Sequence, residues 1–242
     1  MSIFNQLSRA FSRTGYDIRR TDAKRRAELF RHANIDLVLD VGAATGQYAA
    51  EIRRHGYDGT IISFEPLNDA YASLERQAAS DPNWVTIRTA VGAASETGWI
   101  NIAGNSDSSS ILPMLSRHED VAPHTRYVGS QAIEIRPLDQ LVLSDVQSAK
   151  NALLKIDTQG FERSVLDGAA EVMKLLRGVQ IELSFVPLYD GAMKFDEAIE
   201  RLLGEGFDLH LIEPGFRDPD SQQLLQADGV FLRDNNWGPP SS

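Results

Sequence analysis

The sequence predicts an α/β domain organised around a parallel β-sheet. Short apolar runs rich in branched residues, at 37–41, 60–64 and 84–90, have the composition of buried strands. Helical patterns at 46–55 and 67–79 separate these runs. Strands that alternate with helices in this way build a parallel sheet through right-handed crossovers. The chain has 242 residues, of which 42% are hydrophobic, and this suffices for one such domain with a sizeable core.

An insertion at about 92–136 interrupts this alternation. It is rich in glycine and serine, with a serine run at 108–110, and no long helix is convincing within it. Segments 99–102 and 127–136 are compatible with a strand pair. An irregular insertion of this length is either a functional loop or disordered, and we expect residues 104–127 to cover the acceptor on the substrate side.

The alternation returns after the insertion. The expected elements are strand 151–157, a helix after Gly160, strand 179–185, amphipathic helix 195–203, and an antiparallel edge hairpin of 207–212 with 229–233. The predicted domain therefore spans 36–234. A helical extension at 1–35 precedes it, and a flexible tail at 235–242 follows it.

Composition limits the classes of partner. The formal net charge of −10 argues against nucleic acid as the main partner. No apolar run approaches the roughly 20 residues of a membrane helix, so we expect no transmembrane segment. The N-terminus lacks the apolar core of a secretory signal. Cysteine is absent, which excludes disulfides and thiolate metal sites, and a cytoplasmic location is the default expectation.

The charge is uneven along the chain. Residues 1–35 carry eight Lys or Arg against three Asp or Glu. Such a segment could contact an anionic surface or act as a transit peptide. Ala23, Ala27 and Phe30 fall on one helical face, which favours a packed helix whose arginines lie along the acidic body of the domain.

The most informative motif is the strand, turn and helix start at 37–47. A dinucleotide fingerprint needs three glycines. Gly42 and Gly46 fill the second and third places, whereas Asp40 occupies the first. A carboxylate there would repel a pyrophosphate and favour a cation. S-adenosylmethionine has a sulfonium, an ammonium and no phosphate, and it meets this requirement.

A second motif lies one strand later. Glu65 directly follows strand 60–64, roughly 20 positions beyond the glycine turn, where an acidic residue grips the ribose hydroxyls in folds of this type. Its two carboxylate oxygens suit two adjacent hydroxyl donors. The alternative is that Asp40 caps the turn and Glu65 is a solvated strand end.

A third motif follows strand 151–157. Asp157 ends this strand, and Glu162 lies in the first turn of the next helix. Ligands of open parallel sheets bind beyond the carboxyl ends of the strands, so both carboxylates are expected near the glycine turn. A carboxylate in this position can act as a general base, a metal ligand or a helix cap.

Taken together, the motifs Leu39–Gly46, Phe64–Pro66, Ser108–Ser110 and Leu154–Glu162 resemble the successive motifs of the FkbM family of methyltransferases. The resemblance covers roughly residues 36–233. It implies a Rossmann-like, seven-stranded, mostly parallel sheet in the order 3-2-1-4-5-7-6, with helices on both faces. It also implies methyl transfer from S-adenosylmethionine to a hydroxyl. Family acceptors are usually sugars of glycolipids or polysaccharides, or hydroxyls of polyketide-type natural products.

The resemblance also implies site residues. The glycine turn and the ends of the next two strands are expected to contact the cofactor through Asp40, Gly42, Ala43, Gly46, Gln47, Glu65, Pro66, Ala90 and Val91. The serine loop and the third motif are expected to contact the acceptor through Ser109, Ser110, Gln159 and Glu162. Two features depart from the family pattern. Ala44 replaces a common asparagine, and no acidic residue follows Ala90 to bind the adenine amino group, so backbone atoms must read the base.

Three catalytic arrangements remain open. Asp157 is the candidate general base, because an alcohol needs its proton accepted as the new bond forms. Alternatively, Asp157 with Glu182 or Glu162 holds a Mg²⁺ that lowers the pKa of the hydroxyl. His118 or His124 of the insertion is the third candidate. A nicotinamide-dependent oxidoreductase and a non-catalytic interaction module are the rival functions, and the acceptor and the oligomeric state stay undetermined.

Overall fold

The structure is a computed structural model that describes residues 21–234. The expected flexible tail at 235–242 and the first 20 residues of the N-terminal extension lie outside the described residues. Within residues 21–234, none of the helices is long and apolar enough to cross a membrane.

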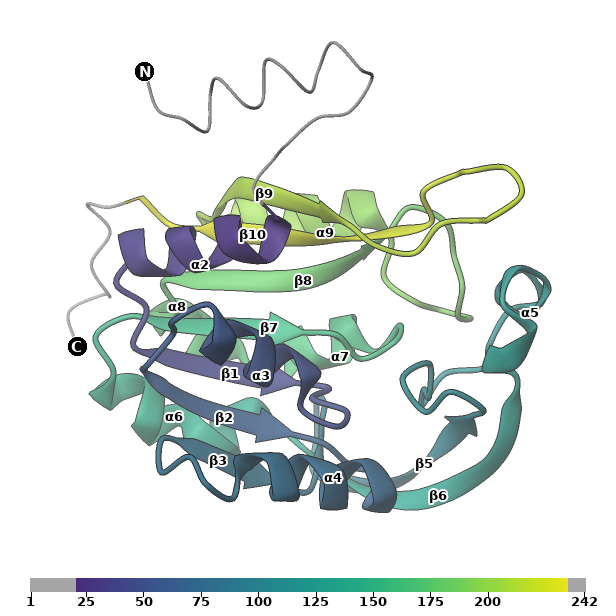
Figure 1. Ribbon diagram of the computed structural model, residues 1–242, viewed down its shortest axis with the longest axis horizontal. Coiled ribbons are helices and arrows are strands. Elements are labelled where there is room, and N and C mark those ends of the chain that lie inside the picture. Colours follow the sequence, from purple (N-terminus) through teal and green to yellow (C-terminus); the bar gives the residue numbers. More distant parts are fainter. Residues whose placement is uncertain (1–20, 235–242) are drawn as a thin grey trace, which may run out of the picture.

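A seven-stranded sheet forms the centre of the domain (Figure 1). Its strands lie in the order β3-β2-β1-β7-β8-β10-β9, which is 3-2-1-4-5-7-6 when only these seven are counted along the chain, as the resemblance implied. All neighbours are parallel except β10, which is antiparallel to both β8 and β9. The bounds are β1 Leu37–Val41, β2 Thr60–Phe64, β3 Trp84–Ile87, β7 Ala152–Ile156, β8 Gly178–Ser184, β9 Asp208–Pro214 and β10 Gln226–Leu232.

Helices cover both faces of this sheet. One face packs against α2 (Asp22–His32), α3 (Gln47–Arg54) and α4 (Asn68–Ala78), and Phe30, Ile52 and Leu74 belong to that core. The other face packs against α6 (Leu138–Ser148), α7 (Glu162–Asp167), α8 (Ala170–Leu175) and α9 (Phe195–Gly204). Side chains alternate along β1, so Leu37, Leu39 and Val41 face the second group while Val38 faces the first.

The insertion forms a second sheet, in the order β4-β6-β5. Strand β5 (Glu96–Ala103) pairs antiparallel with β6 (Tyr127–Arg136), which confirms the expected strand pair and extends its first member. Strand β4 (Ala90–Val91) pairs with β6 in parallel. Between β5 and β6 lie α5 (Ser116–Val121) and the 3₁₀ turn Pro123–Thr125. The insertion is therefore more regular than its composition indicates.

Two expectations about elements were wrong. The segment 84–90 is not one strand, because the chain leaves the large sheet after Ile87 and Ala90 pairs with Ile135 of the insertion instead. Helix α6 was not expected at all. Its buried residues Leu138, Val142 and Val146 recur every four positions, which is a helical signal that the nearby irregular insertion obscured.

Helix α2 is anchored by one buried arginine. The Arg26 guanidinium, 4% exposed, forms ion pairs with Glu51 of α3 and Glu213 of β9. Ala27 and Phe30 are also buried. For this described part of the extension, the interpretation as a packed helix with arginine against acidic residues is confirmed.

Candidate active site at the carboxyl edge of the sheet

The glycine turn between β1 and α3 depends on left-handed backbone at three positions. Gly42, Ala44 and Gly46 have φ values of +77°, +47° and +97°. A Cβ at position 42 would lie 1.8 Å from the carbonyl oxygen of Asp157, so only glycine lets the turn approach the end of β7. At position 46 a Cβ would meet Leu74 and Trp84 at 3.1 Å, so this glycine serves packing beneath the turn.

Asp40 lies beneath this turn, and the structure places it differently from the expectation that it contacts the cofactor. Its side chain is 0% exposed, and one oxygen lies 3.2 Å from Nζ of Lys155, also buried, while the other accepts a hydrogen bond from Ser63 at 3.2 Å. Burial opposes the charge on Lys155, but Asp40 and other carboxylates outweigh it and raise its pKa above the ordinary value. The cation that Asp40 attracts is thus supplied by the protein itself.

Glu65 holds the glycine turn and faces a cavity. The N–H of Ala44 donates to one carboxylate oxygen at 2.9 Å, and the N–H of Leu67 donates to the other at 2.8 Å. Each oxygen keeps a second lone pair for a further donor. Burial raises the pKa of Glu65 to about 7, against the opposing effect of these two hydrogen bonds.

This cavity, the apolar cavity below, extends from the glycine turn to the ends of β2 and β4. Most of its lining is apolar, with Glu65 as a buried carboxylate and residues 89–91 at one end. It is lined by Val41, Gly42, Ala44, Phe64, Glu65, Pro66, Leu67, Ala70, Thr89, Ala90, Val91, Ile100, Ser106, Asp107, Ser109, Ile111, Asp157, Thr158, Gln159 and Phe161. The expected cofactor residues Gly42, Glu65, Pro66, Ala90 and Val91 therefore meet in one space.

A second cavity, the polar cavity below, adjoins the first at the glycine turn. Its walls come from α2, α3, β7, β8, β9 and β10, and most of its side chains are charged or polar. It is lined by Arg26, Gly42, Ala43, Ala44, Gln47, Tyr48, Glu51, Arg54, Asp107, Lys155, Asp157, Gln180, Glu213 and Asp228. Ala43 and Gln47, which were expected to contact the cofactor, line this cavity only.

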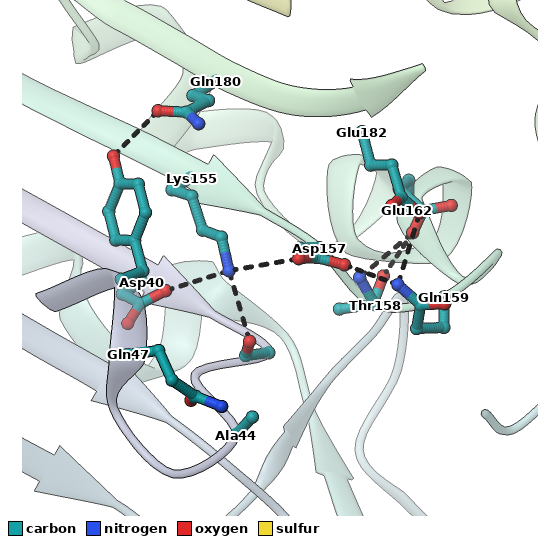
Figure 2. Close-up of polar contacts among 12 residues, drawn as sticks. Asp40, Ala44, Gln47, Lys155, Asp157, Thr158, Gln159, Glu162, Gln180 and Glu182 are labelled. Carbon is teal, nitrogen blue, oxygen red and sulfur yellow. Dashed lines mark hydrogen bonds and ion pairs between the residues drawn. The ribbon is translucent and has the colours of Figure 1, made fainter. Parts of the chain in front are cut away.

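Asp157 lies where the two cavities meet, because its side chain lines both. The side chain is 36% exposed, and its Oδ2 atom is 3.7 Å from Nζ of Lys155. The amide Nε2 of Gln159 donates to Oδ1 at 2.8 Å (Figure 2). The arrangement supplies a proton acceptor at the junction.

A match to a known family model identifies the family of this chain. Residues 40–209 match the family model of the methyltransferase FkbM domain. The chain belongs to the FkbM methyltransferase family. Its cofactor is S-adenosylmethionine, and the apolar cavity with Glu65 suits an adenosyl group. No curated protein sequence matches this chain.

Solved structures share the fold of this FkbM methyltransferase at low identity. A candidate methyltransferase from Thermobifida fusca is 14% identical over 88% of this chain and 79% of its own, with a TM-score of 0.51. A fibrillarin from Aeropyrum pernix with natively bound S-adenosylmethionine is 14% identical over 81% of this chain, with a TM-score of 0.41. The match spans 66% of the fibrillarin, just under two thirds of its length.

The residues expected to contact the acceptor divide into two groups. Ser109 and Gln159 line the apolar cavity. Ser110 is buried and donates its hydroxyl to the backbone oxygen of Gln159 at 2.6 Å. Glu162 accepts hydrogen bonds from both backbone N–H groups of Thr158 and Gly160 at 3.0 Å, so it clamps the turn after β7 rather than facing either cavity. Glu162 and Ser110 thus hold the turn after β7 in place and do not line either cavity.

The two histidines of the insertion lie away from both cavities of the FkbM enzyme. His118 is 3% exposed, and its ring packs against those of Tyr189 and Phe216. Burial lowers the pKa of His118, which favours its neutral form. His124 lies in the 3₁₀ turn with an exposed side chain. Neither histidine lines the cavities that Asp157 joins.

The residues proposed as magnesium ligands do not fit a metal ion. Across residues 21–234, no group of three or more His, Cys, Asp and Glu side chains could hold one. The amide Nε2 of Gln159 lies between Asp157 and Glu182, 2.8 Å from the first and 3.4 Å from the second. Burial and the charges of Asp157 and Glu162 raise the pKa of Glu182 well above its ordinary value. A neutral carboxyl and an amide donor are poor surroundings for a cation.

Sequence reasoning missed three residues of the site, of which only Lys155 carries a signal that could have identified it. Asp228 lines the polar cavity from β10, and burial raises its pKa to about 7. Asp107 reaches both cavities from the insertion. Lys155 stands in the motif that carries the family resemblance, two positions before Asp157, and alternation along a strand would have placed the two side chains on one face.

Proposed function

We propose that this FkbM enzyme is an O-methyltransferase that acts on a hydroxyl of a sugar, in a glycolipid or polysaccharide, or of a natural product. The observation that carries this proposal is the position of Asp157, which lines both the apolar and the polar cavity. A group at this junction can touch the cofactor's reacting end and an acceptor at once.

The apolar cavity is the proposed site of the adenosyl group. Glu65 offers the remaining lone pairs of its two oxygens to the ribose hydroxyls. Thr89, Ala90 and Val91 line the same cavity, and their backbone atoms are the proposed contacts to the base. When bound, S-adenosylmethionine would supply a methyl group on a sulfonium, which a nucleophile takes by in-line attack while the neutral thioether leaves.

Asp157 is the proposed general base. An alcohol is a weak nucleophile at neutral pH, so a positioned acceptor for its proton speeds attack by about 10²–10⁴. Nζ of Lys155 lies 3.7 Å from Oδ2 of Asp157, on one side of the carboxylate. The hydroxyl proton would pass to an oxygen of Asp157 as the acceptor oxygen bonds to the methyl carbon and the bond from that carbon to the sulfonium sulfur breaks.

The lining of the polar cavity favours a hydroxyl-rich acceptor over an apolar one. Gln47, Gln180 and Asp228 present amide and carboxylate groups to this space, which can pair with the several hydroxyls of a sugar. An apolar acceptor would remove water from these groups without offering hydrogen bonds in return, which costs free energy. The same lining also suits the charged amino-acid end of the cofactor.

The test is transfer of a labelled methyl group from S-adenosylmethionine to a panel of glycosides and hydroxylated natural products. We expect methylation of a sugar hydroxyl by the wild-type enzyme, with and without a chelator, and loss of product in Asp157→Asn. Tight cofactor binding by calorimetry without transfer to any acceptor would favour the alternative, a non-catalytic module. Transfer to an amine or a thiol alone would contradict O-methylation.

A further inference from the structure

Tyr189 lies one layer behind the proposed base and is fixed at both ends. Its side chain is 1% exposed. The hydroxyl lies 2.8 Å from Oε1 of Gln159 and 3.1 Å from the backbone oxygen of Ser108, and it can donate to either. Its ring packs edge-on against the ring of His118, with 5.3 Å between the centroids. A phenol held in this way presents its hydroxyl in one place.

Gln159 connects this phenol to the carboxylate. Its Oε1 faces Tyr189, and its Nε2 donates to Asp157 at 2.8 Å, as Figure 2 shows for the second contact. An amide rotated by 180° would turn its oxygen toward two carboxyl groups, those of Asp157 and Glu182. The two carboxyl groups therefore set the amide orientation that donates to the base, and the Tyr189 hydroxyl holds the amide oxygen at the other end.

The backbone of Gln159 is also held. Its φ of +53° places it in the left-handed region, and its carbonyl accepts a hydrogen bond of 2.6 Å from the hydroxyl of Ser110. Tyr189 and Ser110 thus tie the serine loop of the insertion to the turn that carries Asp157. This loop also lines the apolar cavity through Ser109.

We propose that Tyr189 and Gln159 are positioning residues for the general base, a role that rests on the proposed O-methyltransferase function. The amide hydrogen bond fixes Oδ1 of Asp157 and leaves Oδ2, on the side of Lys155, to take the proton from the acceptor. Without it the carboxylate can rotate away from the junction. The cost falls on turnover and not on cofactor binding, because Tyr189 lines neither cavity.

The experiment compares Tyr189→Phe with Tyr57→Phe. Tyr57 is a second buried tyrosine whose hydroxyl bonds an oxygen, that of Thr60, without any contact to Gln159. We expect turnover of the acceptor found in the glycoside panel to fall about tenfold in Tyr189→Phe, because the amide of Gln159 loses the hydrogen bond that supports its donation to the Asp157 carboxylate. The KM of the acceptor and cofactor affinity should stay within about twofold. Tyr57→Phe should leave turnover unchanged.

A second readout does not need an acceptor. Carbon-13 NMR of labelled aspartate carboxyls, with Asp157 assigned by its absence in Asp157→Asn, reports the hydrogen bonding of this carboxyl. We expect the Asp157 carboxyl resonance, measured at one fixed pH, to shift in Tyr189→Phe, because a donor to the carboxylate is weakened. Tyr57→Phe should leave it unchanged.

Gln159→Asn is a second variant that tests the same role if Tyr189→Phe does not fold. Asparagine tolerates the left-handed backbone but is one methylene too short to reach from Tyr189 to Asp157. It should reproduce both effects. If both variants fold and show wild-type turnover and a wild-type Asp157 carboxyl resonance, the positioning role is wrong. If no acceptor in the panel is methylated, the proposed function fails, and the carboxyl resonance alone still decides whether Tyr189 controls Asp157.

Discussion

The residues that line the two cavities at the carboxyl edge are distributed differently along the sequence. The apolar cavity takes much of its lining from three short segments, 41–44, 64–67 and 89–91. The polar cavity takes side chains from six helices and strands that span positions 26 to 228. The residues that bind a cofactor common to a whole family lie in short local motifs, so they can be recognised in the sequence. The acceptor side depends on which strands the topology brings together, so its residues are hard to find in the sequence.

Asp157 belongs to both cavities, and its removal should have the largest effect. Asp157→Asn keeps the shape and the hydrogen bond from Gln159 but accepts no proton. We expect turnover to fall by about 10²–10⁴ with nearly unchanged cofactor affinity. Rate assays with labelled cofactor, alongside calorimetry, check this.

Asp228→Asn is the matched comparison for that variant. Asp228 faces the polar cavity but not the apolar one. Its change should act mainly on the KM of the acceptor and leave turnover largely intact. If Asp157→Asn retains full turnover, Asp157 is not the base, and its position where the two cavities meet does not support the proposed function.

A variant of Lys155 tests whether the buried ion pair between Lys155 and Asp40 stabilises the fold. Lys155→Met removes the partner of Asp40, whose side chain is 0% exposed, and leaves a buried charge without compensation. Breaking a buried pair in this way costs about 3–5 kcal/mol of the free energy of unfolding. Chemical denaturation measures the loss.

Two further variants separate charge from packing. Lys174→Met removes an exposed lysine of α8, 56% accessible, and should change stability by less than about 0.5 kcal/mol. The double variant Asp40→Asn with Lys155→Met should be more stable than Lys155→Met alone, because no unpaired charge remains. A double variant as unstable as the single one would show that Lys155 acts by packing.

The protonation of Glu65 is expected to make the affinity for the cofactor depend on pH. Its pKa in the free protein is about 7 because of burial. Two ribose hydroxyl donors favour the carboxylate, so cofactor binding should release a proton, and affinity should fall as the pH drops below about 7, by at most about tenfold per unit. The stability sign is opposite: the raised pKa makes the folded state hold a proton between 4.5 and about 7, so its contribution to stability is lost as the pH rises through that window.

Calorimetry of S-adenosylmethionine binding between about pH 6 and pH 8 tests this dependence. Glu65→Gln should flatten it and weaken binding at pH 8 by about 1.5–3 kcal/mol. Asp228→Asn is the control, since Asp228 also has a pKa of about 7 but lies in the polar cavity. If the slope vanishes in Asp228→Asn and survives in Glu65→Gln, Glu65 does not hold the ribose.

The sequence predicts the sheet and the apolar cavity well, because both follow from local patterns. Branched apolar runs mark β1, β2 and β7, alternating apolar residues mark β8, and Glu65 follows its strand directly. Asp40 shows the limit: its place in the turn is correct, but its partner Lys155 comes from a strand 115 positions later. Pairing across strands decides whether a carboxylate faces a ligand or a buried ammonium. Tyr189 is similar, since its contact to Gln159 arises only where the segment after β8 packs on the turn after β7.

The smallest expected effect concerns Ala44, where the chain departs from its family. Ala44 holds φ at +47°, which costs an L residue with a Cβ about 1 kcal/mol, whereas asparagine and glycine adopt this region more readily. Ala44→Asn and Ala44→Gly should therefore each raise the free energy of unfolding by up to about 1 kcal/mol, or the melting temperature by about 2–4 °C. Only the asparagine adds an amide that can reach the two cavities, both of which Ala44 lines. Tighter cofactor binding in Ala44→Asn but not in Ala44→Gly would show a direct contact of the family's asparagine. Equal affinities in the two variants would limit this position to backbone geometry, and a loss of stability in both would mean that the turn tolerates alanine without strain.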